Sequence, residues 1–435
     1  MAARLTPIKE ALRTYLEALS AVLRPPEVET ASVPEEALGR VLAEDVVAPV
    51  DLPAFSRAVM DGYAVRAADT FSAKPGRPVR LRLIGSVLAG QAPEEVSAIR
   101  VGPGECVEVA TGAVLPEGAD AVVRAEHARA VGDTVEVFVP VSPGSSVDEA
   151  GRDVRAGEVA LEHGRLLRIP DVALLLALGI RSVEVFARPR VGVLAVGSEL
   201  VDALEVPALR PGQVRDVDRP MLVLLIRELG AEPVDLGIVP DELEAIRERL
   251  EEGLAACDAV ITCGGASVGQ RDLAVRAVGG LEGARVIVHR VSMRPGRPVA
   301  LALVGGKPIL CLPGPPAACL LAFLVFARPV LLKLMGVRDD LVPIWPTVRV
   351  RLAGGVPSRV GFTDLVRVRL ALAPDGSLLA EPLALRGAGI LSTLARANGV
   401  VLVPEELDML AEGVEADVLL FSSPELARRA GGWPG

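Results

Sequence analysis

The stretch Cys263-Gly264-Gly265-Ala266-Ser267-Val268-Gly269-Gln270-Arg271-Asp272 directly follows the apolar run Asp258-Ala259-Val260-Ile261-Thr262. Glycines at the end of a strand allow backbone N–H groups to approach an anion closely. Asp272 would repel a phosphate unless a divalent cation lay between them, so the stretch predicts a nucleotide or phosphate ligand that carries Mg²⁺. One glycine loop is equally compatible with an ordinary turn between a strand and a helix.

The sequence on both sides of this loop alternates between strands and helices from Pro189 to Gly336. Repeated strand-helix units predict a mostly parallel sheet with helices on both faces, and ligands bind such sheets beyond the carboxyl ends of the strands. The predicted strands cover residues 191–196, 233–239, 258–262, 285–291 and 308–312, and the predicted helices cover 220–229, 241–254, a segment from Asp272 and an apolar segment after Pro316.

Two β-rich regions accompany this unit, so we predict a multidomain chain of the α/β plus β class. Short β-rich runs broken by glycine and proline fill residues 46–147, and further alternating runs follow Trp345. The predicted domains are a mixed α/β unit made of 1–45 and 150–186, an inserted β domain at 46–149, the α/β domain at 187–336, a C-terminal β domain at 337–424 and a tail at 425–435.

The composition of the 435 residues excludes several classes of protein. A formal net charge of −10 argues against a nucleic-acid or acidic-membrane binder, and an aromatic content of 3% argues against stacking platforms for single strands. The five cysteines lack CxxC spacing, which indicates neither a disulfide framework nor a thiolate metal site and suits the cytoplasm. The histidines His127, His163 and His289 are scattered and near no carboxylate pair, so we do not expect them to bind metal.

The apolar segments predict buried or amphipathic helices. Residues 1–23 carry leucine and isoleucine at helical spacing among charged neighbours, which is typical of an amphipathic helix and not of a signal peptide. The longest apolar run, 317–327, is closed by Arg328 and Pro329 and falls short of the roughly 18 residues that a spanning helix needs. We therefore expect it to be a buried helix.

Three loops of the α/β domain should lie together at one sheet edge. Gly197-Ser198-Glu199 follows the first strand, the glycine loop with Asp272 follows a central strand, and Pro313-Gly314 follows the last. Asp241 opens a helix after a further strand and could instead be its N-cap, while Glu199 could be an ordinary surface residue.

Other polar residues stand out against their surroundings. Arg294 and Arg297 flank a Pro-Gly turn within Arg290-Val291-Ser292-Met293-Arg294-Pro295-Gly296-Arg297-Pro298, so both could project toward an anion, although a solvated turn would look the same. Asp61 and Thr111 lie in turns amid apolar sequence, where either could be structural.

Several of these stretches, in order along nearly the whole chain, resemble the molybdopterin molybdenumtransferase (MoeA) family, which includes the gephyrin E domain. The stretches are Met60-Asp61-Gly62-Tyr63-Ala64-Val65-Arg66, Thr111-Gly112-Ala113, residues 116–123, residues 264–272, Arg294-Pro295-Gly296-Arg297-Pro298, Leu312-Pro313-Gly314 and residues 391–399. Several spaced motifs are far more specific than one glycine loop.

The resemblance implies an enzyme that inserts molybdate into adenylylated molybdopterin, requires Mg²⁺ and releases AMP. It also implies an elongated homodimer of four-domain subunits that dimerises through the N-terminal mixed domain, with each cleft formed by the α/β domain of one subunit and the inserted β domain of the other. The family positions tied to activity fall on Asp61, Thr111, Glu199, Asp241, Asp272, Arg290 and Arg294.

The remaining residues receive ligand-binding roles from the same resemblance. Asp272, with Asp241 or Glu199, is expected to hold Mg²⁺, while Arg290, Arg294 and Arg297 hold molybdate and the pterin phosphate. The expected substrate-binding residues are Gly264, Gly265, Ser267, Gly269, Arg297, Pro313, Gly314 and Ser392, the last near the molybdate pocket.

The chain departs from the family pattern around the expected oxyanion pocket. Arginine replaces the usual lysine at positions 290, 294 and 297, and Phe362 stands where an arginine is usual, a loss for which Arg359 could compensate. Leu312-Pro313-Gly314-Pro315-Pro316-Ala317-Ala318 lacks an amide and a hydroxyl, Asp216-Val217-Asp218 replaces Asp-Ser/Thr-Asn, and Phe55-Ser56-Arg57-Ala58 replaces Phe-Asp-Asn-Ser.

These departures leave three hypotheses open. The leading one is the enzyme; the second is a non-catalytic paralogue that binds or carries a pterin; the third is a scaffold, which the absence of a partner-recruiting extension disfavours. AMP release from adenylylated molybdopterin separates the enzyme from the carrier.

Overall fold

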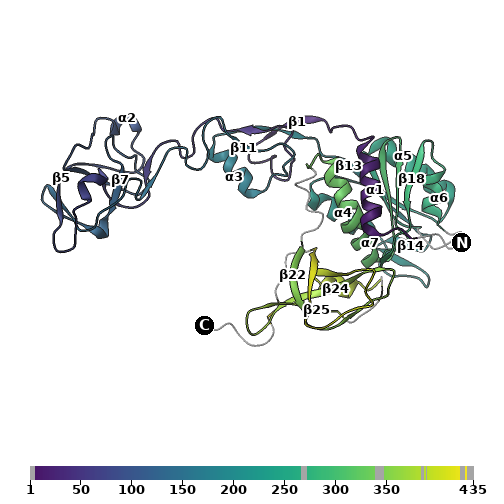
Figure 1. The fold of residues 1–435 in the computed structure, drawn as a ribbon. Helices are drawn as coiled ribbons and strands as arrows, with labels where there is room; N and C mark the ends of the chain where they lie inside the picture. The colour runs from purple at the N-terminus through teal and green to yellow at the C-terminus, as the bar shows by residue number, and fades with distance from the viewer. Residues whose placement is uncertain are drawn as a thin grey trace.

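The computed structural model describes residues 5–265, 272–338, 347–383, 387, 389–421 and 427–428. The predicted ligand-binding residues Ser267 and Gly269 lie outside the described residues. The chain is elongated, with the sheet that contains β5 and β7 at one end and the α/β domain at the other (Figure 1). A middle unit with β1, β11 and α3 connects them, and a further β unit with β22, β24 and β25 lies beside the α/β domain.

The α/β domain is built on a six-stranded sheet that is mostly parallel, as predicted. Its order is β16 (Glu232–Val239), β13 (Arg190–Val196), β17 (Ala259–Gly264), β21 (Lys307–Leu312), β20 (Ala300–Val304) and β18 (Ala284–His289), and the first four strands are parallel. Apolar residues of both strand faces are buried, because α4 (Asp218–Leu229) and α7 (Pro316–Ala322) contribute to one core while α5 (Leu243–Ala256) and α6 (Leu273–Gly279) contribute to the other.

The strand β20 is absent from the sequence prediction. It pairs antiparallel with both β18 and β21, and it joins β21 through Gly305 and Gly306, which both have positive φ. Glycine adopts this conformation at little cost, so a tight reversal is possible here. The run Ala300–Val304 is fully buried, which removes the alternation that would have marked it as an antiparallel strand.

The N-terminal amphipathic helix exists as α1 (Ile8–Ser20), but it packs on the α/β domain and not with the rest of residues 1–45. Its residues Ile8, Leu12, Tyr15 and Leu19 are buried in the same core as β13 and α4, and the Tyr15 hydroxyl donates to the Ala302 carbonyl at 2.9 Å. Burial raises the pKa of Tyr15. Helix α1 therefore packs against the sheet of the α/β domain.

The long apolar helix continues past the point where we expected it to end. Helix α7 runs through a π-helical segment, Phe323–Ala327, into α8 (Arg328–Leu334). Proline has no N–H to donate, and the wider π turn directly before Pro329 lets the chain remain helical. In the described part of the chain this helix, Pro316–Leu334, is long and apolar enough to span a membrane by composition alone, with mean hydropathy 2.0, and 89% of its apolar window is buried inside the protein.

The middle unit and the inserted β region each have their own core. The middle core joins β1 (Val28–Ser32) and β12 (Ser182–Phe186), which pair antiparallel, to α3 (Ile169–Ala177). The inserted region forms a six-stranded sheet in the order β7-β4-β6-β5-β9-β8. Its strands are β4 (Gly62–Val65), β5 (Val79–Val87), β6 (Glu105–Val109), β7 (Ala121–Arg124), β8 (Ala128–Val131) and β9 (Thr134–Val137). The region also contains the short helix α2 (Pro93–Val96). Two short strand pairs lie outside this sheet: β3 (Arg57–Ala58) pairs with β10 (Val147–Asp148), and β2 (Val46–Val47) pairs with β11 (Val159–Leu161).

The C-terminal β unit is a closed barrel. Its strands pair in the circular order β24-β25-β22-β28-β26-β24, and the barrel thereby removes its exposed edges. These strands are β22 (Thr347–Leu352), β24 (Thr363–Leu372), β25 (Leu378–Pro382), β26 (Gly399–Val403) and β28 (Glu415–Leu420). Two short strands add to β24, namely β19 (Met293–Arg294) from the α/β domain and β29 (Ala427–Arg428), which lies in the segment that we expected to be a tail.

Candidate active site

A cavity of about 640 Å³, which we call the glycine-loop cavity, lies at the carboxyl ends of β13, β17 and β21. The register explains the meeting of these loops, since Val196 pairs with Gly264 and Cys263 pairs with Leu312. The predicted site residues that line it are Glu199, Asp241, Gly264, Gly265 and Gly314. The expectation that the strand-end loops share one sheet edge is confirmed for these residues.

The glycines of the cavity are required by close backbone approach. Gly264 and Gly265 have φ of +84° and +62°, and a Cβ atom on Gly264 would lie 2.2 Å from the Val196 carbonyl oxygen. A Cβ atom on Gly314 would lie 3.1 Å from the Gly264 Cα. The β17 and β21 loops therefore pack backbone against backbone, which no larger residue allows. Pro313, directly before Gly314, is buried and is not among the residues that line the cavity.

Asp241 holds the neighbouring loop and does not cap the helix. Its Oδ2 accepts a hydrogen bond from the Ser198 N–H at 3.0 Å, and its own N–H donates to the Ser198 Oγ at 2.9 Å. Helix α5 instead has Glu242 as its N-cap, without a side-chain capping bond. The N-cap alternative for Asp241 is therefore wrong, and the reciprocal pair fixes the loop that carries Glu199.

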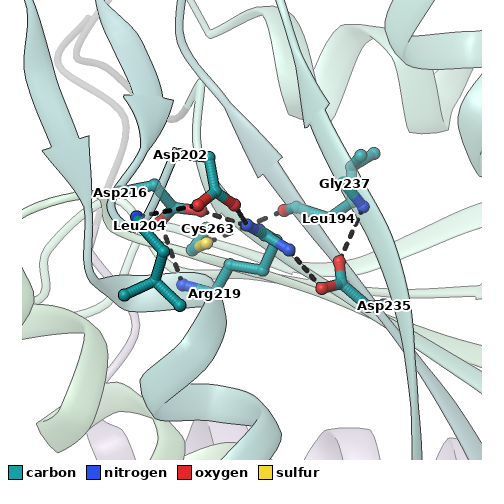
Figure 2. A network of polar contacts seen from close by, with 8 residues as sticks. All are labelled: Leu194, Asp202, Leu204, Asp216, Arg219, Asp235, Gly237 and Cys263. Atoms are coloured by element: carbon teal, nitrogen blue, oxygen red, sulfur yellow. Dashed lines mark hydrogen bonds and ion pairs between the residues drawn. The ribbon is translucent and has the colours of Figure 1, made fainter. Parts of the chain in front are cut away.

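An ion-pair network centred on Arg219 includes Asp216, a buried residue that lines the cavity (Figure 2). Arg219 of α4 donates to Asp216 at 2.8 Å and to Asp202 at 2.6 Å, and it also contacts Asp235 of β16. Asp202 ends β14 (Leu200–Asp202) and Asp216 ends β15 (Val214–Asp216), and these two strands pair with each other. The single guanidinium thus fastens the β14–β15 segment to the main sheet.

Asp218 is a cavity residue that the sequence analysis did not select. It is the first residue of α4, is 7% exposed, and lines the glycine-loop cavity. Burial, together with the nearby Asp216 carboxylate, raises the pKa of Asp218 to about 7. The only sequence signal was a second acidic residue two positions after Asp216 at the start of a helix.

Asp272 does not line the glycine-loop cavity with Glu199 and Asp241. It is 3% exposed, its Oδ2 lies 2.9 Å from the His289 Nε2, and its Oδ1 is buried without a hydrogen-bond partner. His289 thus lies beside one carboxylate and not a carboxylate pair, since β18 brings it beside the start of α6. The described residues contain no group of three or more His, Cys, Asp or Glu that could hold a metal ion.

Arg294 lies in a different cavity from Glu199. A cavity of about 1030 Å³, which we call the barrel cavity, is lined by Arg294, Pro295 and residues of the C-terminal barrel, among them Ser358, Arg359 and Asp364. The reason is the β19–β24 pairing, which places Arg294 directly opposite Asp364. Arg294, an expected molybdate ligand, therefore does not line the cavity that contains the expected Mg²⁺ ligands Glu199 and Asp241.

The charge of Arg294 is balanced within the barrel cavity. Its Nε donates to Asp364 Oδ1 at 2.6 Å, its second contact is to Asp364 Oδ2, and Ser358 donates to the same carboxylate at 2.9 Å. Hydrogen bonding to Asp364 raises the pKa of Arg294. Two guanidinium groups lie near the Phe362 ring, with the ring centroid 5.2 Å from the Arg294 Cζ and 5.8 Å from the Arg359 Cζ.

The remaining predicted residues lie around these cavities or far from them. Arg297 and Ser392 are exposed, and Ser392 follows Leu391, the first residue of α9 (Leu391–Arg396), which lines the glycine-loop cavity. Arg290 ends β18 with a positive φ of 68°. None of the three lines either cavity.

Asp61 and Thr111 form a pair at the opposite end of the subunit. The Asp61 Oδ1 accepts hydrogen bonds from the Thr111 N–H at 2.7 Å and from its hydroxyl at 2.8 Å, and these bonds lower the pKa of Asp61. Both residues border the sheet that contains β7, far from β13 and α4 (Figure 1). One subunit alone therefore does not bring this pair to the glycine-loop cavity.

Three family models cover nearly the whole chain. They are the MoeA N-terminal region (domain I and II) at residues 6–179, a "probable molybdopterin binding domain" at 192–333 and the MoeA C-terminal region (domain IV) at 349–421. The chain belongs to the MoeA family. Among relatives of this family, the molybdopterin molybdenumtransferase of Bacillus subtilis is 34% identical over 89% of this chain and 88% of its own length.

Two further MoeA proteins show the same likeness along the chain. The molybdopterin molybdenumtransferase of Staphylococcus aureus (strain COL) is 30% identical over 96% of both chains. The crystal structure of the molybdopterin biosynthesis MoeA protein from Pyrococcus horikoshii OT3 has a TM-score of 0.79 and 32% sequence identity, with 96% of this chain and 100% of that chain covered. The predicted fold, the role in molybdenum cofactor biosynthesis and the enzyme class are confirmed at this level.

Proposed function

We propose that this MoeA-family enzyme inserts molybdate into adenylylated molybdopterin, whose nucleotide portion binds at the glycine-loop cavity, in a reaction that requires Mg²⁺ and releases AMP. The observation that carries the proposal is an acidic cavity beside a loop suited to phosphate. Glu199, Asp216, Asp218 and Asp241 all line it, together with the glycine backbone of β17.

The charge of the cavity is the argument for Mg²⁺. Among the described residues that line the cavity, Arg215 is the one with a cationic side chain, and it already donates to the carbonyls of Val206 and Pro207. Each carboxylate at about 4 Å from a phosphate would oppose binding by about 1 to 4 kcal/mol. A divalent cation reverses this effect, because Mg²⁺ binds one or two carboxylates together with substrate phosphates and keeps several waters.

Glu199 and Asp241 fit such a cation. Both are exposed at the cavity, both follow neighbouring parallel strands, and Asp241 is held in place by Ser198. The Oδ1 of Asp272, which is buried without a hydrogen-bond partner in the described part of the chain, is a third candidate ligand. When bound there, Mg²⁺ would polarise the phosphoanhydride that breaks as AMP leaves.

The barrel cavity is our candidate for the molybdate site. Arg294 and Arg359 flank Phe362, and guanidinium groups are suited to a tetrahedral oxyanion. Asp364 neutralises Arg294, so Arg359 would supply the uncompensated charge that the usual arginine at position 362 gives in the family. Arg290 and Arg297 remain candidates for the pterin phosphate.

We further propose a cytoplasmic homodimer. The Asp61–Thr111 pair lies at the far end of its own subunit, so a second copy would be needed to bring such a pair to the glycine-loop cavity. The hydroxyl and the carboxylate would then orient the substrate from the opposite wall of the cleft.

AMP release measured with purified protein, adenylylated molybdopterin, molybdate and Mg²⁺ tests the proposal. Asp241→Asn should lower the rate at least tenfold and raise the Mg²⁺ concentration needed for half-maximal rate, because it removes one negative ligand. Glu242→Gln changes the adjacent exposed acid and should have little effect. Substrate binding without AMP release in the unmodified protein would favour the carrier hypothesis, and equal rates for both variants would contradict the role of Asp241.

A further inference from the structure

We propose that Asp218 binds the nucleotide portion of the ligand in the glycine-loop cavity as a neutral carboxylic acid, donating a hydrogen bond to an acceptor atom of that ligand. The identity of the ligand rests on the proposed function, whereas the state of Asp218 rests on the structure alone. Asp218 would then be a binding residue that makes affinity depend on pH near neutrality.

The geometry places an unsatisfied carboxyl group at the cavity wall. Asp218 is 7% exposed, it is among the residues that line the cavity, and its Oδ1 is buried without a hydrogen-bond partner in the described part of the protein. Buried polar atoms almost always have a partner, so a group of this kind beside a cavity indicates that a ligand atom supplies it.

The charges around Asp218 favour its neutral form. Asp216 is 2% exposed and pairs with Arg219, and its carboxyl group lies near Asp218. Arg219 does not offset the charge of Asp218, because its guanidinium group is already paired with Asp216, Asp202 and Asp235. Burial and the Asp216 charge together raise the pKa of Asp218 to about 7.

No other element around Asp218 in the described part of the chain adds a positive charge that would reverse this preference. Cys263 of β17 and Cys319 of α7 are buried thiols whose pKa values are raised by burial, so they stay neutral. Glu199 and Asp241 face the same cavity as acids, and the Arg215 guanidinium is bonded to backbone carbonyls. The N-terminus of α4 favours an ionised Asp218, but this effect is smaller than the combined effect of burial and Asp216.

A neutral Asp218 suits an anionic nucleotide in two ways. It removes one negative charge from a cavity that already carries several, and it supplies a donor where an ionised carboxylate could only accept. A nucleotide offers many acceptors, among them phosphate oxygens and ring nitrogens. Binding should therefore draw a proton onto Asp218 whenever the free protein is partly ionised.

Calorimetric titration with AMP in the presence of Mg²⁺ tests this inference, with each protein measured in two buffers of different ionisation enthalpy. At pH 7.5 a group with a pKa of about 7 would take up about three quarters of a proton when the neutral form alone binds. Asp218→Asn keeps one donor and one acceptor but cannot titrate, so its proton uptake should be lower by that amount. Between pH 6 and pH 8 the ratio of the unmodified protein's Kd to that of the asparagine variant should rise about tenfold.

A second variant and the pattern of outcomes separate the two proposals. Asp218→Ala has no titrating group at this position, so its AMP affinity should lack the pH dependence that Asp218 causes. It should bind AMP more weakly than Asp218→Asn, because it lacks the hydrogen-bond donor. The role of Asp218 would be overturned if the unmodified and asparagine proteins showed equal proton uptake and parallel pH profiles of Kd. Net proton release attributable to Asp218 would also overturn it. Both results would leave the proposed function intact. Failure of all three proteins to bind AMP would overturn both the nucleotide contact and the nucleotide site on which it rests.

Discussion

Replacing Asp218 by asparagine should stabilise the α/β domain, and by more at pH 8 than at pH 5. The folded protein raises the pKa of Asp218 from 3.8 to about 7, mainly through burial and then through Asp216. When folding raises the pKa of an acid, the folded protein favours the protonated form of that acid. Its contribution to stability is therefore fully present below the unfolded value near 4 and is lost as the pH rises toward 7.

The size of the effect follows from the shift. One pKa unit corresponds to about 1.4 kcal/mol, and integration between pH 5 and pH 8 gives a loss of about 2 to 3 kcal/mol for the unmodified protein. Asparagine has nearly the same shape and no charge to desolvate, so it should not suffer this loss. The difference in the free energy of unfolding between the two proteins should grow by that amount across the interval.

The assay must report on the α/β domain alone, because the chain has several cores that need not unfold together. Hydrogen exchange of peptides from α4 and β17, measured in urea at pH 5 and pH 8 and corrected for the intrinsic exchange rate, gives the local free energy of opening. Glu228→Gln, which changes an exposed acid of the same helix, is the control. A stability difference between Asp218→Asn and the unmodified protein that is the same at both pH values would refute the reasoning.

Two further substitutions test the architecture of the cavity. Arg219→Met leaves the buried Asp216 without its cation and should lower the free energy of opening of the α/β domain by about 3 to 5 kcal/mol, measured by the same hydrogen exchange of α4 and β17 peptides, whereas Arg227→Met on the exposed face of α4 should change it little. A loss below about 1 kcal/mol for Arg219→Met would show that the network in Figure 2 is not a structural support. Gly264→Ala places a Cβ atom 2.2 Å from the Val196 carbonyl oxygen, so it should abolish AMP release and make the domain sensitive to proteolysis. Gly279 has open space around it, so Gly279→Ala should keep near-normal AMP release and protease resistance. An active Gly264→Ala protein would contradict the close packing of the two strand-end loops.

The sequence predicted the parts of this protein that depend on local patterns. The strands β13, β17 and β21 contain continuous apolar runs of the kind that a parallel sheet buries on both faces, while the edge strand β16 is only partly buried, and glycine or proline ends or follows each strand. Their common direction is enough to bring Glu199, Asp241, Gly264 and Gly314 to one edge. The strand β20 was missed because its buried run gives no alternation, and a hairpin of Gly305 and Gly306 was the only sign of it.

The sequence alone determined that this chain has a central α/β sheet with a glycine loop at its carboxyl edge, because strand periodicity and glycine placement are local properties. Only the tertiary structure decided which charges meet. Arg294 faces Asp364, from which it is separated by 70 residues, because β19 joins the barrel, and His289 meets Asp272 because β18 passes beside α6. The raised pKa of Asp218 likewise depends first on burial, which only the packing of α4 against the sheet provides, and then on the nearby Asp216.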